Sequence, residues 1–252
     1  MTKKSLLITN DFPPIVSGIA TAFYQLWRYL PVDNIVIMAP QVKNSADFDR
    51  DQPFKILRKW IPIGESSTSK LAKSIIIAFY AIILVKKLNV HKLHCGQLIS
   101  TGLAGLLCKK LFNIPYAVYV YGSETARFGR SKPVMKLVSK IIDEAEQLIP
   151  NSEFTLNEFL RFGVKKEKMV KIVPGVDTEF FYPKDKSESL QKKYNLKDHK
   201  VLLTVSRLDE RKGQDMVIQA LVKVLTKYPD TKYIIAGKGR EEARLKSIAK
   251  EL

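Results

Sequence analysis

The chain has 252 residues, of which 46% are apolar and 10% aromatic, so it can bury a core in one large domain or two small ones. Its 42 lysine and arginine residues against 25 aspartate and glutamate residues give a formal net charge of +17, which attracts nucleic acid, anionic lipid and phosphorylated substrates. Because most of the excess comes from scattered lysines, with no arginine-rich patch interleaved with aromatic residues, specific nucleic-acid binding is the weaker interpretation.

Short apolar runs alternate with helix-length amphipathic stretches along the first part of the chain. The expected strands span residues 5–9, 34–39, 54–60, 90–95, 116–121 and 147–150. The expected helices span residues 18–30, 70–88, 98–112 and 133–146. This alternation predicts an α/β fold in which helices cover both faces of a mostly parallel sheet. Ligands of such sheets bind where the carboxyl ends of the strands meet the following loops.

The loop after the first expected strand reads NDFPPIVSGIA. Its two prolines favour an extended backbone, Ser17 and Gly18 allow a tight turn, and a helix is expected to start at about Ile19. Backbone N–H groups at a helix start attract anions and polar ligands. The loop is therefore a candidate phosphate or sugar cradle, although most glycines at such positions are simple turns.

The expected helix 70–88 contains an apolar run, Ser74–Val85, between lysines. The flanking lysines are Lys70, Lys73, Lys86 and Lys87. A helix needs about 20 apolar residues to cross a bilayer, so this run is too short to span one. Two interpretations stay open: a buried helix with lysines extending to solvent at its ends, or a helix that dips into a membrane surface between cationic anchors.

Two histidines and two cysteines lie in the middle of the chain. His91 and His94 have the spacing H-x-x-H, but without a third ligand nearby we expect no metal site, and His94 is instead a candidate for lining the ligand edge. Cys95 and Cys108 lie in apolar surroundings and are expected to be buried thiols in a reducing compartment. The first apolar stretch, SLLIT, is too short for a signal peptide, so the expected location is cytoplasmic.

A break follows at residues 174–191, where Pro and Gly open an irregular stretch and charged residues end it. A strand at 201–206, a helix at about 213–228 and a strand at 232–237 then indicate a second α/β domain. The expected domains are 1–183 and 184–252. Because so few elements cannot form a complete doubly wound sheet, the second domain is expected to be incomplete.

Four phrases, in order and in register, resemble those of one protein family. They read TNDFPPIVSGIATAFYQLWRYLP, PNSEFT (150–155), VPGVDTEFFYP (173–183) and VSRLDERKGQDMVIQAL (205–221). Together they are similar to the retaining glycosyltransferases of family 4. The resemblance implies the GT-B fold, with two Rossmann-like domains facing each other across a cleft, of which the first accommodates the acceptor and the second the nucleotide-sugar donor.

By the same resemblance, Arg207 and Lys212 are the catalytic residues, because they correspond to the two cations that bind the diphosphate of the donor. A departing nucleoside diphosphate gains negative charge, which fixed cations stabilise. Arginine offers a planar fork to phosphate oxygens and lysine a point charge. An isolated Arg-x4-Lys would otherwise be interpreted as two solvated surface cations.

The resemblance also assigns substrate-binding positions in both domains. These positions are Ser17, Gly18, Tyr121, Gly122, Glu124, Asn151, Ser152 and Gly213. Many family members carry a histidine where this chain has Tyr121, which can support sugar binding by one hydrogen bond but cannot shuttle a proton at neutral pH. The family's pair of glutamates seven residues apart has no counterpart here, since Glu241 and Glu242 are adjacent.

The implied activity is transfer of a hexose from a nucleoside-diphosphate sugar to a glycan or lipid-linked hydroxyl, with retention and without a metal or other cofactor. Guanosine diphosphate mannose is the preferred donor on overall resemblance. The positive charge and the Ser74–Val85 run favour peripheral contact with an anionic membrane at the inner face. Two alternatives remain: a catalytically incomplete remnant that binds glycan or a partner, and a nonspecific polyanion binder.

Overall fold

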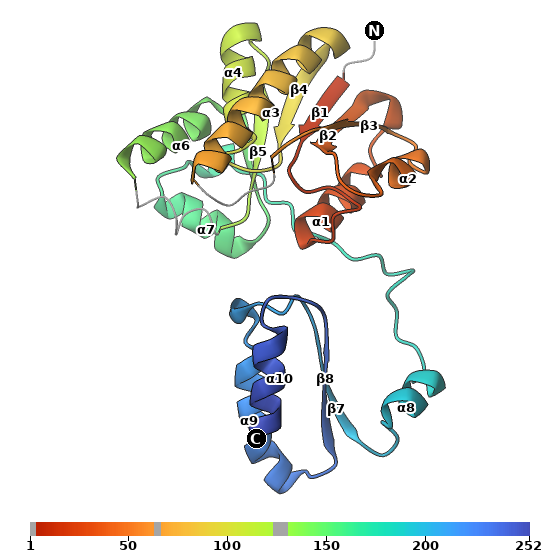
Figure 1. The fold of residues 1–252 in the computed structure, drawn as a ribbon. Coiled ribbons are helices and arrows are strands. Elements are labelled where there is room, and N and C mark those ends of the chain that lie inside the picture. Colours follow the sequence, from red (N-terminus) through yellow and green to blue (C-terminus); the bar gives the residue numbers. More distant parts are fainter. Residues whose placement is uncertain (1–3, 63–66, 123–130) are drawn as a thin grey trace. The chain divides into compact units, whose positions relative to one another are not determined.

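The computed structural model describes residues 4–62, 67–122 and 131–252 (Figure 1). Contacts divide the chain into two compact units, Met1–Asp177 and Thr178–Leu252, called the first and the second unit below. The boundary between them falls after Asp177, whereas the sequence-based boundary was expected after residue 183.

The first unit is built on one parallel sheet. Its strands are β1 (Lys4–Ile8), β2 (Ile35–Pro40), β3 (Lys55–Lys59), β4 (Val90–Cys95), β5 (Tyr116–Val120) and β6 (Gln147–Pro150). Its helices are α1 (Gly18–Trp27), α2 (Ser45–Arg50), α3 (Ser67–Leu88), α4 (Gly102–Phe112), α6 (Lys132–Glu144) and α7 (Glu153–Arg161). The strand order is β3-β2-β1-β4-β5-β6 and every pairing is parallel, which confirms the predicted sheet. This order is that of a Rossmann fold, whose ligands lie at the carboxyl ends of the strands near β1 and β4.

Side chains on the two faces of the sheet form two separate cores. One core joins Leu6, Ile8 and Val118 to helices α3, α4, α6 and α7. The other core joins Leu7 and Tyr119 to α1 and α2. Successive residues of a strand point to opposite faces, so strands buried on both sides must be apolar throughout. This explains why β2 and β5 are buried along their whole length.

The observed helices differ from the expected ones in extent and number. Helix α4 starts at Gly102, not at residue 98, because Thr101 Oγ1 donates to the Gln97 carbonyl (2.7 Å) and accepts from its N–H (2.9 Å) in a closed turn. Helices α2 and α7, and α8 of the second unit, were not expected. They are six to nine residues long, too short for a clear helical period.

The second unit contains a two-stranded sheet and three helices in its described order. The elements are α8 (Glu188–Tyr194), β7 (Lys200–Val205), α9 (Gln214–Lys227), β8 (Thr231–Ala236) and α10 (Glu242–Glu251). β7 and β8 pair in parallel over six residues, as a right-handed β-α-β connection through α9 requires. The core of this unit is small and centres on Leu208, Ile218 and Leu245.

Cys95 and Cys108 are fully buried and unpaired with each other, which confirms the expected buried thiols. Burial raises the pKa of both thiols, to about 12 for Cys108. No helix in the described ranges combines the length and the apolar character that crossing a bilayer requires.

Candidate functional site

The loop between β1 and α1 is held by hydrogen bonds to the loop after β4. The Asn10 N–H donates to Gln97 Oε1 (3.0 Å), and Asn10 Nδ2 donates to Ser100 Oγ (2.6 Å). Gln97 Nε2 also donates to Thr9 Oγ1 (3.1 Å). Because β1 and β4 are adjacent strands of a parallel sheet, their loops meet at the same edge. The loop conformation is thus fixed by neighbours 87 to 90 residues away in the sequence.

Ser17 and Gly18 form the start of α1. Ser17 is the N-cap, with its hydroxyl accepting from the Ala20 N–H (3.0 Å) and donating to Asp11 Oδ1 (3.3 Å). The next two amides, of Gly18 and Ile19, have no acceptor within the described part of the chain. A Cβ on Gly18 would meet nothing within 4 Å. Glycine is therefore not required by packing there, and its effect is to leave open space before two outward amides.

A cavity of about 460 Å³ lies along α1 in the first unit. It is lined by three of the predicted substrate-binding residues, Gly18, Tyr121 and Asn151, together with Tyr29 and the segment 172–177. A cavity with mainly apolar and aromatic walls and a few polar groups suits a sugar ring or the apolar part of an acceptor. The structure therefore brings together residues that lie more than 130 positions apart in the sequence.

The other predicted residues of the first unit have local structural roles. Gly122 has a φ of +79°, and a Cβ there would lie 2.9 Å from Thr155 Oγ1, so both backbone conformation and space require glycine. Ser152 is the N-cap of α7, accepting from the Thr155 N–H (3.1 Å), while Asn151 Oδ1 accepts from Thr155 Oγ1 (2.8 Å). Glu124 lies outside the described residues.

Sequence reasoning missed Arg58, on β3. Its guanidinium donates to both oxygens of Asp49, at 2.7 and 3.0 Å, and to the carbonyls of Pro13 (2.5 Å) and Pro40 (3.2 Å). The side chains of Arg58 and Asp49 are only 7% and 20% exposed. Arg58 thereby attaches the proline loop before Gly18 to the sheet edge. A single basic residue in an expected strand gave no signal of this role.

His94 is buried beneath α1 and does not line the cavity. Its ring packs edge-on against Trp27, with centroids 5.1 Å apart, and lies 6.2 Å from the Tyr119 ring. Nδ1 of His94 finds no hydrogen-bond partner in the described ranges. Burial lowers the pKa of His94 to about 4, with Lys92 and His91 adding repulsion. The expected position at the ligand edge is therefore wrong for this side chain.

We expect His94 to make the first unit less stable in mild acid. The unfolded chain titrates at its ordinary value of 6.5 and the folded chain at about 4, so protons bind first to the unfolded chain as the pH falls through 6.5. About 2 kcal/mol of stability is lost by pH 5 from this group. Urea titrations followed by Trp27 fluorescence at pH 7 and pH 5 measure the loss, and His94→Gln should remove most of that difference. An equal pH dependence in this variant would contradict the assignment.

In the second unit, Arg207 and Lys212 lie on the turn between β7 and α9. A short 3-10 turn, Glu210–Lys212, ends at Gly213, whose φ of +67° suits glycine and starts α9. Gln214, which is buried, donates from Nε2 to Ser206 Oγ (2.9 Å) and to the Arg207 carbonyl (3.0 Å). The backbone that carries the two cations is thus fixed, while their side chains are exposed.

Neighbouring cations of this turn are paired and these two are not. Arg211 and Arg240 both reach Asp209, at 3.5 and 3.6 Å, and Arg244 reaches Asp215 at 2.7 Å. Within the described ranges, neither Arg207 nor Lys212 forms an ion pair with a carboxylate of the chain. Their charges are thus available to an external anion.

A second loop supports this turn from behind. The Leu208 N–H donates to the Lys238 carbonyl (3.0 Å), and a Cβ on Gly237 or Gly239 would lie only 1.9 Å from the Ser206 carbonyl oxygen or 2.1 Å from that of Leu208. Both glycines are therefore needed for close backbone approach. They were missed from the sequence, although two glycines directly after an apolar strand are a recognisable signal.

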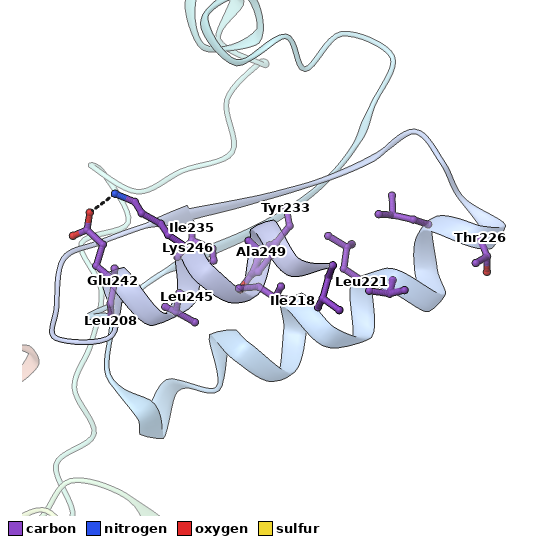
Figure 2. A pocket seen from close by; sticks show the side chains of 14 residues that line it. Leu208, Ile218, Leu221, Thr226, Tyr233, Ile235, Glu242, Leu245, Lys246 and Ala249 are labelled. Carbon is purple, nitrogen blue, oxygen red and sulfur yellow. Dashed lines mark hydrogen bonds and ion pairs between the residues drawn. The ribbon is translucent and has the colours of Figure 1, made fainter.

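A larger cavity of about 740 Å³ also lies in the second unit, between α9, β8 and α10 (Figure 2). Its walls are mainly aliphatic, as the side chains of Ile218, Leu221 and Leu245 show, and a Glu242–Lys246 ion pair of 2.7 Å lies near one end. Neither Arg207 nor Lys212 lines it. Its chemistry does not suit a charged nucleotide. Among the residues that the structure describes, no group of three or more His, Cys, Asp or Glu could hold a metal ion.

Comparison with known proteins identifies the family. A family model described as Glycosyltransferase Family 4 matches residues 16–180, and one described as Glycosyl transferases group 1 matches residues 185–252. The chain is 27% identical over 252 residues to a GDP-mannose-dependent alpha-(1-6)-phosphatidylinositol monomannoside mannosyltransferase of Mycolicibacterium smegmatis, covering 98% of this chain and 64% of the relative. It is 26% identical over 260 residues to the alpha-monoglucosyldiacylglycerol synthase of Streptococcus pneumoniae, covering 98% and 58%. The chain thus spans less than two thirds of the length of these relatives.

The fold is similar to that of Anabaena Alr3699/HepE, solved in complex with UDP-glucose, with a TM-score of 0.76 and 15% identity over 99% of this chain and 66% of that one. This likeness and the parallel sheet confirm the predicted α/β fold of the GT-B type. With the first family model covering most of the first unit, the chain belongs to glycosyltransferase family 4.

Proposed function

We propose that the protein transfers a hexose from a nucleoside-diphosphate sugar to an acceptor hydroxyl with retention. The observation that carries this proposal is the pair of exposed cations, Arg207 and Lys212, which have no carboxylate partner within the described chain although Arg211, Arg240 and Arg244 do. Unpaired cations on a rigid strand-to-helix turn suit a diphosphate.

In the proposed reaction the bond between the anomeric carbon and the diphosphate oxygen breaks, and a bond from that carbon to the acceptor oxygen forms on the same face. The acceptor proton passes to the departing diphosphate. Arg207 and Lys212 stabilise the negative charge that the diphosphate gains, which lowers the barrier without a protein nucleophile or a metal. The Gly18 and Ile19 amides and the cavity beside Tyr121 and Asn151 contribute to holding the sugar and the acceptor.

We infer a mannosyl donor and a lipid-linked acceptor from the relatives. The Mycolicibacterium relative is named for GDP-mannose and a phosphatidylinositol mannoside, and the Streptococcus relative for a diacylglycerol product. Both names join a hexose to a lipid. We therefore propose guanosine diphosphate mannose as the donor, a lipid-linked hydroxyl as the acceptor, and peripheral association with the cytoplasmic face of a membrane.

Arg207→Ala and Lys212→Ala should each lower the affinity of this chain for guanosine diphosphate by tenfold or more, which corresponds to about 1.4 kcal/mol per tenfold. Each substitution removes a cation that would contact the diphosphate, and the exposed side chains support no contact of the fold. Titration calorimetry with guanosine and uridine diphosphates at fixed salt measures the effect.

Arg211→Ala is the matched control, since it removes the same charge from the same turn but from a residue paired with Asp209. Equal losses in all three variants would show nonspecific attraction of polyanions and contradict the proposed site. Transfer of labelled mannose to lipid, with the anomeric configuration of the product determined by NMR, tests the reaction itself; an inverted product would contradict retention.

A further inference from the structure

Helix α3 is apolar on its inner face, which packs on the sheet. Ile77, Ala78, Ala81, Leu84 and Val85 are buried in the same core as β1 and β5. These positions recur at intervals of three and four residues, as expected for one face of a helix. The inner face therefore accounts for only part of the apolar run Ser74–Val85.

The outer face of α3 is also apolar, and there it is uncovered by the described chain. Leu71, Ile75, Phe79 and Ile83 are 59%, 56%, 61% and 44% exposed, and they are called the α3 stripe below. Their spacing of four places them along one side of the helix, over about 18 Å at 1.5 Å per residue. A solvent-facing helix side normally carries polar residues, so a continuous apolar stripe indicates a contact surface.

Lysines surround the α3 stripe with almost no opposing charge. Helices α3, α4 and α6, which pack side by side on one face of the sheet, contain four, two and three lysines against two acidic residues, Asp143 and Glu144. Within the described side chains, none of the lysines of these helices forms an ion pair. Figure 1 shows α3, α4 and α6 together on one side of the first unit.

Individual lysines are positioned next to apolar and cationic neighbours. Lys86 Nζ lies 5.2 Å from the centre of the Phe112 ring on α4, directly past the end of the α3 stripe. Lys110 on α4 and Lys140 on α6 are neighbours, and the Lys110 ammonium lowers the pKa of Lys140 below its usual range. Two adjacent ammonium groups without a counterion form a favourable place for a phosphate group.

We propose that the α3 stripe and its surrounding lysines bind the surface of an anionic lipid bilayer. The apolar side chains enter the boundary between headgroups and acyl chains, and the lysines contact lipid phosphates. A second copy of the chain is disfavoured as the occupant, because a symmetric contact through this face would place lysines against lysines. The surface contains none of the residues assigned to the nucleotide sugar, so lipid binding and nucleotide binding can fail independently.

Cosedimentation with vesicles of phosphatidylcholine containing phosphatidylglycerol tests the proposal. Phe79→Ser should weaken binding about tenfold by removing a buried aromatic ring from the bilayer. Lys86→Gln with Lys87→Gln should weaken it by roughly tenfold or more. Binding to both vesicles and variants should fall steeply as salt is raised, because exposed charges are screened.

Matched controls separate this surface from the protein's overall charge and greasiness. Phe154→Ser replaces a phenylalanine of α7 that is 67% exposed, and Lys165→Gln with Lys166→Gln removes the same charge elsewhere in the first unit. Both controls should bind vesicles as the parent chain does. Equal losses in controls and test variants, equal binding to pure phosphatidylcholine, or a concentration-dependent dimer that Phe79→Ser abolishes would each overturn the proposal.

Discussion

Replacing Arg58 by methionine should lower the free energy of unfolding of the first unit by about 3–5 kcal/mol. The side chain keeps its approximate volume, but Asp49 is left without its cation in a site where the two side chains are 20% and 7% exposed. The carbonyls of Pro13 and Pro40 lose a donor as well. Urea unfolding followed by tryptophan fluorescence isolates this effect, because both tryptophans, Trp27 and Trp60, belong to the first unit.

Two further variants test the cause of that loss. Arg50→Met breaks a pair with Asp47 in which the side chains are 75% and 72% exposed, and should cost less than about 1 kcal/mol. Adding Asp49→Leu to Arg58→Met should restore part of the stability, since it removes the uncompensated buried carboxylate. Similar losses for Arg58→Met and Arg50→Met would show that burial of the pair contributes nothing.

Gly239→Ala should disrupt the turn that carries Arg207 and Lys212. A Cβ there would lie 2.1 Å from the Leu208 carbonyl oxygen and 2.8 Å from the Leu208 nitrogen, both backbone atoms, so the two loops must separate. We expect a loss of about 3 kcal/mol, as for overpacking of a tight contact. The second unit has a small core, and such a loss should appear as faster amide exchange along Lys200–Val205 and weaker binding of guanosine diphosphate.

Gly175→Ala is the control for this substitution, because a Cβ at Gly175 meets nothing within 4 Å and its backbone needs no left-handed conformation. It should leave amide exchange in the second unit unchanged. Protection of the β7 amides in Gly239→Ala equal to that of the parent chain would refute the idea that the Gly237–Gly239 loop supports the Arg207 turn.

The sequence alone was sufficient for the fold class and the family. Alternating apolar strands and amphipathic helices require a parallel sheet with helices on both faces, since each strand must be buried on two sides. The same local logic located the helix start at Ser17 and Gly18 and the turn between Arg207 and Lys212. Such features are determined by residues within a few positions of each other, which is why a pattern predicts them.

Other features depend on contacts between distant residues, and only the tertiary structure decided them. Arg58 reaches Pro13 across 45 positions, and Gly239 meets the Leu208 backbone across 31. His94 is taken from the ligand edge into the core by Trp27, 67 positions away. No period or spacing contains these contacts.

The apolar run of α3 shows the same division. The sequence determined that Ser74–Val85 is apolar on every side and bounded by lysines, which left burial and surface contact as equal descriptions of one helix. The tertiary structure placed Ile77, Ala81 and Val85 against the sheet and left the α3 stripe exposed. Sequence determines how much apolar surface a helix has, whereas packing decides which part of that surface is already covered, because covering it depends on neighbours brought in from elsewhere in the chain.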